Sequence, residues 1–386
     1  MSPIRICSLA IGMLMGWTSR GAADVCAYVA NGGSNSVSVI DVATNTVRVT
    51  IPVGDTPRAV AVTPDASIVY VANGHARTLS VIDTATNTVV ATIPGGRDPR
   101  DVEVSPDGAR IYVSNGSSDA VAVIDAATLM FVTDEIHVGD APRGMALTPN
   151  GRRAYVTVTL DDQVALIDTD SDRFLGSIAV GAGPTDVAIT PDGTQAYVAN
   201  GNAISIIDVR TNVVVRNLRI GNSPRNVAVA PDGLRVYATN NEAVYVIDTA
   251  PQSIDTGRLI TSPTAVAVTP DSRRVYVASG NAIVVLDAKA HIVVPEIPVG
   301  DAPASIAIAA IPGQCGVAAC GGDCSGDGIV SIDEILSLVS IALGSRPVSM
   351  CAAGDLSHDG SVAVDEILTA VHAALDGCPP AGESVR

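Results

Sequence analysis

Two acidic runs near the end of the chain carry the residues with the clearest chemistry. They read DCSGDGIVSIDE at 323–334 and DLSHDGSVAVDE at 355–366. Each run has oxygen-bearing side chains at positions 1, 3, 5 and 12, a glycine at position 6 and a backbone carbonyl at position 7, which is the pattern of a twelve-residue calcium loop. The predicted ligands are Asp323, Ser325, Asp327, Ile329, Ser331 and Glu334 in the first run and Asp355, Ser357, Asp359, Ser361 and Glu366 in the second. The sequence therefore predicts two bound calcium ions.

A second candidate site is built from residues that recur along the chain. It consists of four arginines that each follow a proline, and of two aspartates that each lie one position further along the repeat: Arg58, Arg100, Asp101, Arg143, Asp186 and Arg225. If the segments meet at one end of a channel, they form a ring of mixed charge that receives a small anion or a partner loop. The alternative is a polar rim that only solvates the ends of strands.

These arginines belong to a unit that occurs seven times with a period of 39 to 43 residues. A tyrosine opens each copy, at Tyr28, Tyr70, Tyr112, Tyr155, Tyr197, Tyr237 and Tyr276. Every copy contains four short runs rich in Val and Ile, separated by turn residues such as Pro-Asp-Gly, which indicates four antiparallel strands. Radial repetition of such units makes a β-propeller. We predict an all-β, seven-bladed propeller over residues 24–312, closed by pairing of a last strand at 304–309 with the N-terminal blade.

Residues present in every copy are predicted to be scaffold. The aspartate of the Val-Ile-Asp motif, such as Asp41 or Asp83, is expected to cap a turn, because one reaction does not need seven carboxylates. The tyrosines are expected to pack between blades. Departures from the repeat are the candidates for function. Glu103 replaces an alanine that the other six copies keep, and it is either a ligand of the channel or a tolerated variation.

The copies resemble the YVTN family of β-propeller repeats through the run YVAN, which begins at Tyr28, Tyr70 and Tyr197. The resemblance covers roughly residues 27 to 312. It implies an exported or surface-layer protein. Similar propellers include lactonases, lyases and electron-transfer partners, so the fold alone does not decide the function.

Residues 313–386 are predicted to form a second, small α-helical domain. Each calcium loop is followed by a predicted helix, at 334–343 and 366–375, and neither loop is preceded by one. This arrangement, duplicated 32 residues apart, resembles a dockerin type I module with EF-hand-type loops. The resemblance implies calcium-dependent attachment to a protein partner, either a cohesin-like protein or the cell surface. Ile332-Asp333 and Val364-Asp365 stand where cohesin-binding dockerins commonly carry a pair of hydroxyl residues. We therefore do not extend binding of a true cohesin from the resemblance to this chain.

Composition and the N-terminus restrict the setting. The net charge of −17 argues against nucleic acid as a partner. Residues 1–23 read as a secretory signal peptide, and no other segment is apolar enough to be a transmembrane segment after cleavage. We therefore expect a secreted protein, extracellular or associated with the cell surface, with the periplasm as the alternative. Six cysteines would remain after cleavage, which predicts disulfides, with Cys26 to Cys315 or Cys320 as one candidate pair.

The leading interpretation is an exported, non-enzymatic binding or scaffold protein, in which the propeller is a recognition platform and the tail an attachment module. The alternative is an exported propeller enzyme, a lactonase or lyase acting on polysaccharide-derived material and tethered by the same tail. No catalytic residue is predicted, because His75, His137 and His291 lack metal-ligand spacing and the chain has no nucleophile-elbow or phosphate-loop motif.

Overall fold

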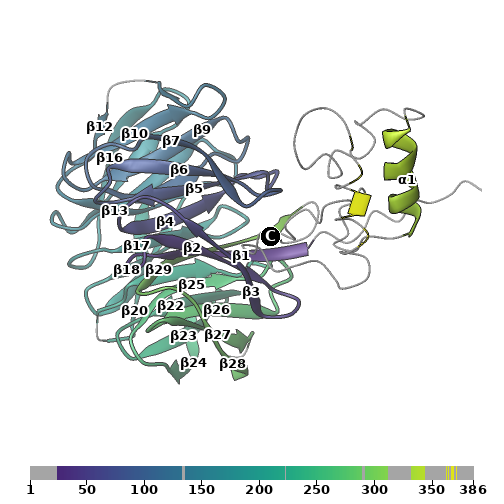
Figure 1. Cartoon of the computed structure of the whole chain (residues 1–386). Coiled ribbons are helices and arrows are strands. Elements are labelled where there is room, and N and C mark those ends of the chain that lie inside the picture. The colour runs from purple at the N-terminus through teal and green to yellow at the C-terminus, as the bar shows by residue number, and fades with distance from the viewer. Residues whose placement is uncertain are drawn as a thin grey trace, which may run out of the picture.

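The structure is a computed structural model that describes residues 24–132, 135–221, 223–288, 292–311 and 332–343, with single residues at 362, 364, 367, 368 and 371. Its strands form seven separate antiparallel sheets. Figure 1 shows these sheets as blades arranged around one axis. The predicted seven-bladed propeller is therefore confirmed.

The first three blades contain the strands nearest the N-terminus. From the inside outward, blade 1 has β29 (Pro303–Ile311), β1 (Asp24–Asn31), β2 (Ser36–Asp41) and β3 (Thr46–Pro52), and blade 2 has β4 (Pro57–Val62), β5 (Ile68–Asn73), β6 (Thr78–Asp83) and β7 (Thr88–Pro94). Blade 3 has β8 (Pro99–Val104), β9 (Arg110–Asn115) and β10 (Ala120–Asp125), and its outer strand is split into β11 (Met130–Phe131) and β12 (Ile136–His137).

The other four blades follow in the same order. Blade 4 has β13 (Pro142–Leu147), β14 (Arg153–Val158), β15 (Gln163–Asp168) and β16 (Arg173–Ala179), and blade 5 has β17 (Asp186–Ile189), β18 (Gln195–Asn200), β19 (Ala203–Asp208) and β20 (Val213–Arg219). Blade 6 has β21 (Asn226–Val229), β22 (Arg235–Thr239), β23 (Ala243–Asp248) and β24 (Ser253–Leu259), and blade 7 has β25 (Pro263–Val268), β26 (Arg274–Ser279), β27 (Ala282–Asp287) and β28 (Ile292–Pro298).

The ring closes through backbone pairing between the two ends of the propeller chain. Strand β29 runs antiparallel to β1, with Ala309 opposite Cys26 and Ala307 opposite Tyr28. Blade 1 is thus completed by a strand from the far end of the repeat region, as predicted. The pairing occupies the edge that β1 would otherwise present, which would be open to association with other chains.

The hairpins between the third and fourth strands explain two recurring residue types. The predicted Asp caps are present, since Asp83, Asp168 and Asp208 each accept a backbone N–H from three residues later at 2.7 to 2.8 Å. The same hairpins place Asn45 and Asn87 in the left-handed region, with φ of 55° and 50°. Asparagine tolerates this conformation better than most residues because its side chain bonds locally.

The repeated tyrosines are buried, and several of them tie one blade to the next. The hydroxyls of three tyrosines donate to the left-handed asparagine of the following blade: Tyr28 to Asn87 at 3.1 Å, Tyr155 to Asn212 at 2.7 Å and Tyr276 to Asn45 at 2.6 Å. Blade 3 has Leu129 at this hairpin position, and Tyr70 has no hydroxyl partner among the described residues. The tyrosine and the asparagine therefore recur because they meet across blades.

Little of the predicted tail domain lies within the described residues. Helix α1 (Ile332–Ala342) covers most of the first predicted helix, and its Leu338 is buried. The calcium-ligand side chains of both loops lie outside the described residues. The division of the chain at residue 312, and the bound calcium, therefore stay predictions.

Two further predictions concern the cysteines and the membrane. Cys26 is fully buried in β1 and is disulfide-bonded, but every other cysteine lies outside the described residues, so its pairing stays a prediction. Within the described part of the chain, no helix has the length and apolar character that a membrane crossing requires.

The seam between blades 7 and 1 gives a stability test. Tyr276→Phe removes the hydroxyl that bonds Asn45, and we expect the free energy of unfolding to fall by about 1 kcal/mol. Tyr70→Phe is the matched control, because its hydroxyl has no partner among the described residues, and it should change stability by less than half as much. Urea unfolding of the three proteins measures both, and equal losses would contradict this role of the hydroxyl.

Candidate functional site

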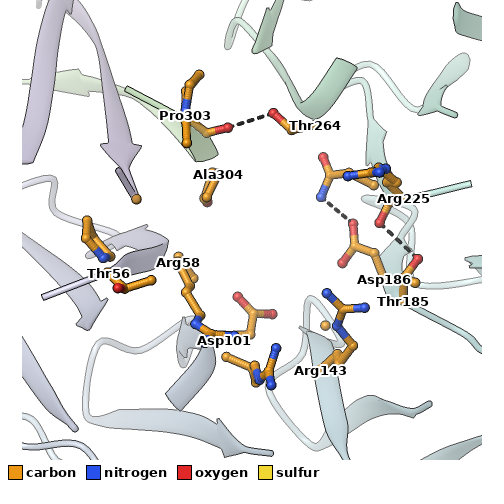
Figure 2. A pocket seen from close by; sticks show the side chains of 18 of the residues that line it. Thr56, Arg58, Asp101, Arg143, Thr185, Asp186, Arg225, Thr264, Pro303 and Ala304 are labelled. Carbon is orange, nitrogen blue, oxygen red and sulfur yellow. Dashed lines mark hydrogen bonds between the residues drawn. The ribbon is translucent and has the colours of Figure 1, made fainter. Parts of the chain in front are cut away.

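A cavity of about 690 Å³ lies where the inner strands of all seven blades begin. We call it the central cavity, and its wall includes residues within the first three residues of β4, β8, β13, β17, β21, β25 and β29, or just before them. All six residues of the predicted charged ring line it: Arg58, Arg100, Asp101, Arg143, Asp186 and Arg225. Figure 2 labels five of these side chains, all except that of Arg100, around the pocket.

A repeated backbone turn brings these side chains to the same place in each blade. The residue before the proline that starts an inner strand is left-handed, as at Thr56 (φ 56°), Asp98 (φ 61°) and Ala141 (φ 57°). The proline then fixes the chain in an extended direction, and the next residue is the arginine. Blade 5 uses Gly183 (φ 56°) and has Thr185 instead of arginine. The turn is therefore a common scaffold on which one residue varies.

Three of the four arginines lie against the loop after the second strand of their own blade. In blades 2 and 3 this loop has a glycine, and a Cβ atom added to Gly74 or Gly116 would lie 2.2 or 2.9 Å from the Nε of Arg58 or Arg100. In blade 6 the loop has Asn241, whose Oδ1 accepts a hydrogen bond from Arg225 Nε at 2.8 Å. The guanidinium groups are thus partly pre-organised.

Asp98 is a site residue that the sequence reasoning missed. Its Oδ1 lies 3.2 Å from Arg58 Nη2, and its Oδ2 lies 2.7 Å from Arg100 Nη2. One carboxylate therefore joins the arginines of blades 2 and 3. The signal was present in the repeat, because the six other copies have Thr, Ala, Ser or Gly immediately before this proline.

Asp101 and Asp186 connect inner strands of neighbouring blades. Asp101 Oδ2 accepts the Met145 N–H of blade 4 at 2.7 Å, and Asp186 Oδ2 accepts the Val227 N–H of blade 6 at 2.8 Å. Asn226 extends this pattern, since its Nδ2 donates to Asp186 at 2.6 Å and its Oδ1 accepts the Val266 N–H of blade 7 at 2.8 Å. These side chains have a structural role beside any role in binding.

Asp101 and Asp186 do not have the charge state expected of carboxylates in a solvated polar rim. Part of each residue faces the central cavity, but the surrounding blades exclude bulk water. Desolvation, together with the charge of Asp186, raises the pKa of Asp101 to about 7. Desolvation also raises the pKa of Asp186 to about 7, against its backbone hydrogen bonds and the attraction of Arg143. Near neutral pH both carboxyl groups are therefore only partly ionised.

The arginines of the cavity repel one another. Desolvation and the charges of Arg100 and Arg58 lower the pKa of Arg143, and its guanidinium forms no ion pair with any described residue. Desolvation and the charge of Arg100 also lower the pKa of Arg58. Within the described residues, Asp98 is the one carboxylate paired with any of the four cavity arginines. The central cavity therefore favours an anion.

Two family models match parts of the chain. A model described as a YNCE-like beta-propeller matches residues 4–111, and one described as a lactonase, 7-bladed beta-propeller, matches residues 75–174. Both models describe β-propellers. Each covers less than a third of the chain, and no curated protein sequence matches it.

Solved structures also share the fold. A hydrazine synthase structure from Kuenenia stuttgartiensis is 23% identical with a TM-score of 0.59, covering 64% of this chain and 88% of that chain. A functionally unknown protein from Desulfotomaculum acetoxidans is 20% identical with a TM-score of 0.67, covering 74% of this chain and 99% of that chain. At these identities the likeness is one of fold.

The raised carboxyl pKa values predict a pH-dependent stability. An aspartate titrates near 3.9 in an unfolded chain and here near 7, so between these values the folded state holds more protons. The contribution of Asp101 and Asp186 to stability should therefore fall as the pH rises from about 4 to 7 and level off above. Thermal midpoints from pH 5 to 8 measure this.

The double variant Asp101→Asn/Asp186→Asn separates this contribution from other titrating groups. It removes both charges but also weakens the hydrogen bonds to Met145 and Val227, so its absolute stability is not informative. Its midpoint should change less between pH 5 and 7 than that of the wild type. Parallel pH profiles would mean that the two carboxyl groups are not perturbed.

Proposed function

We propose that this is an exported binding protein, not an enzyme, whose propeller takes a small organic anion in the central cavity. The observation that carries the proposal is the gathering of four arginines around one cavity with a single carboxylate paired to them among the described residues. Guanidinium groups bind carboxylates and phosphates through two parallel hydrogen bonds, and they stay charged under all physiological conditions.

The overall charge of the protein makes this cavity distinctive. The chain carries 40 acidic residues against 23 Lys and Arg, so the protein as a whole repels anions. A concave site with the opposite sign concentrates the field between walls of low dielectric constant and selects anions that reach it. The loop contacts that position the side chains of Arg58, Arg100 and Arg225 reduce the conformational entropy that these side chains lose when a ligand binds.

The triple variant Arg58→Ala/Arg100→Ala/Arg143→Ala tests the proposal. Using citrate and inorganic phosphate as probes, isothermal titration calorimetry should detect binding to the wild type and none to the variant. Arg143→Ala alone, which breaks no ion pair with a described residue, should weaken binding at least about tenfold, since a charged hydrogen bond contributes about 1.5 to 3 kcal/mol.

Arg48→Ala is the matched control. Arg48 lies on the outer strand of blade 1, paired with Asp41 and 46% exposed, and it does not line the central cavity. This variant should bind both probes like the wild type. Wild-type affinity in the triple variant, with its fold intact by circular dichroism, would refute the site.

The enzyme alternative has one observation in its favour. The match to the lactonase model includes Arg100, Asp101 and Arg143. A carboxyl group with a pKa of about 7 beside guanidinium groups has the properties of a general acid or base. Turnover of a sugar lactone by the wild type, lost in Asp101→Asn, would favour a lactonase over a binding protein.

The tail supplies the second part of the proposed function. We infer from the two loop sequences that residues 313–386 bind two calcium ions and attach the propeller to a protein partner or the cell surface, in the manner of a dockerin-like module. The proposed export rests on residues 1–23, which lie outside the described residues, and it agrees with the disulfide bond of Cys26. We propose Cys315 or Cys320 as the partner of Cys26.

Calcium binding can be measured on the full chain. Titration after chelator treatment should give about two ions per chain, with dissociation constants of about 10⁻⁴ to 10⁻³ M, because a neutral serine at position 3 removes one charge from each loop. The double variant Glu334→Gln/Glu366→Gln should lose both sites, since it removes the bidentate ligand at position 12. Calcium binding that is the same in the variant and the wild type would contradict the loop assignment.

A further inference from the structure

Asp101 and Asp186 line the central cavity, and Glu103 is a third carboxyl group on the same strand as Asp101. Asp101 and Glu103 are two residues apart on β8 and therefore project to the same face of the blade. The charges of Asp101 and Asp186 both act on Glu103. None of the three carboxyl groups forms an ion pair within 4 Å with a described Lys, Arg or His side chain. The three acids therefore have no paired counter-ion among the described residues, although the charge of Arg143 acts on Asp186.

Glu103 is the member that the fold does not require. The six other blades have alanine at this position, where Ala61 is buried against the next blade. A carboxyl group enclosed by protein and lacking a counter-ion destabilises the folded state, because it loses hydration without gaining an attraction. Burial and the charges of Asp101 and Asp186 raise the pKa of Glu103 well above its usual range. Glu103 is therefore a candidate for a role in binding.

The three carboxyl groups have unused capacity to accept hydrogen bonds. An ionised carboxylate accepts about four. Asp101 accepts two, from the Val102 and Met145 backbone, and Asp186 accepts from Asn226 and Val227. Glu103 accepts none from any described residue. A group with several N–H donors and a positive charge would satisfy this capacity, and an ammonium group has both.

We propose that the central cavity binds a small zwitterion of the amino-acid class, with its acidic group on the arginines and its ammonium group on the carboxyl cluster of Asp101, Glu103 and Asp186. The inference rests on the proposed anion site and names its ligand class. Both halves are present in one cavity, since Arg143, Asp101 and Asp186 all line it and Figure 2 labels their side chains in the same pocket. A simple anion would satisfy only the arginines.

The two ligand classes should respond oppositely to pH. The other charged groups at the central cavity are Arg58 from β4, Arg100 from β8, Arg143 from β13 and Arg225 before β21, and Asp98 pairs with the first two of these arginines. As the carboxyl groups ionise around neutral pH, they offset these arginines and weaken the binding of a simple anion. The same ionisation strengthens the binding of an ammonium group, which stays protonated below about pH 10.

The test uses matched probes on the full chain. 4-Aminobutyrate and 6-aminohexanoate are compared with butyrate and hexanoate, which lack only the amine, by calorimetry at pH 6 and pH 8. We expect at least one amino acid to bind about tenfold more tightly than its partner acid, with a ratio that increases from pH 6 to pH 8. Glu103→Ala restores the residue of the other six blades, so it should fold, and it should lower this ratio to near one.

Each outcome separates this inference from the proposed anion site. If each amino acid and its partner acid bind equally at both pH values, the zwitterion proposal fails and the anion site stands. A preference for the amino acid that persists in Glu103→Ala also overturns it, because the ammonium group then binds elsewhere. If neither probes of this series nor citrate and phosphate bind, both proposals fail.

Discussion

The structure depends on contacts between neighbouring blades. A four-stranded blade cannot bury both of its faces alone, so each sheet is stable only when the next blade covers it. The pairing of β29 with β1 makes the ring continuous, and bonds such as that of Tyr276 to Asn45 fasten the same seam. Closure of the ring fixes the position of each inner strand along the propeller axis. It therefore also fixes the position of each residue that lines the central cavity.

The repeat also explains how a binding site can arise without disturbing the fold. The turn before each inner strand is the same in all blades, and the residue after its proline is free to vary because it faces the cavity. Arg143 and Thr264 occupy equivalent positions after this turn, and both line the central cavity. Thr264 donates to the Pro303 carbonyl of the next blade at 2.6 Å, which is a structural use of the position, whereas Arg143 has no such partner among the described residues. Variation on a constant turn is the physical origin of the cavity's charge.

Much of the fold followed from the sequence, because the period of the tyrosines and the alternating strand pattern are local signals. Seven blades, the closing strand and the caps at Asp83 and Asp168 were all predicted and are present. The position of the arginines also followed, because all repeats share one phase. The contacts of the tail's calcium loops lie outside the described residues and stay predictions.

The details of the site could not be predicted, because they depend on residues of other blades. Asp98 looks like a turn residue until its two arginine partners, from two blades, are seen together. Asp101 looks like a rim carboxylate, yet it accepts the Met145 N–H at a sequence separation of 44 residues. The environment of Glu103 likewise comes from Asp186, two blades away. Charge, burial and partners at a ring axis are set by geometry that one repeat does not contain.

A crystal structure of the full chain grown with citrate tests the central claim most directly. We predict electron density for the anion in the central cavity, within hydrogen-bond distance of the Arg143 guanidinium and of Arg58 or Arg100. Citrate bound only elsewhere, or a central cavity filled by a segment of the protein itself, would contradict it.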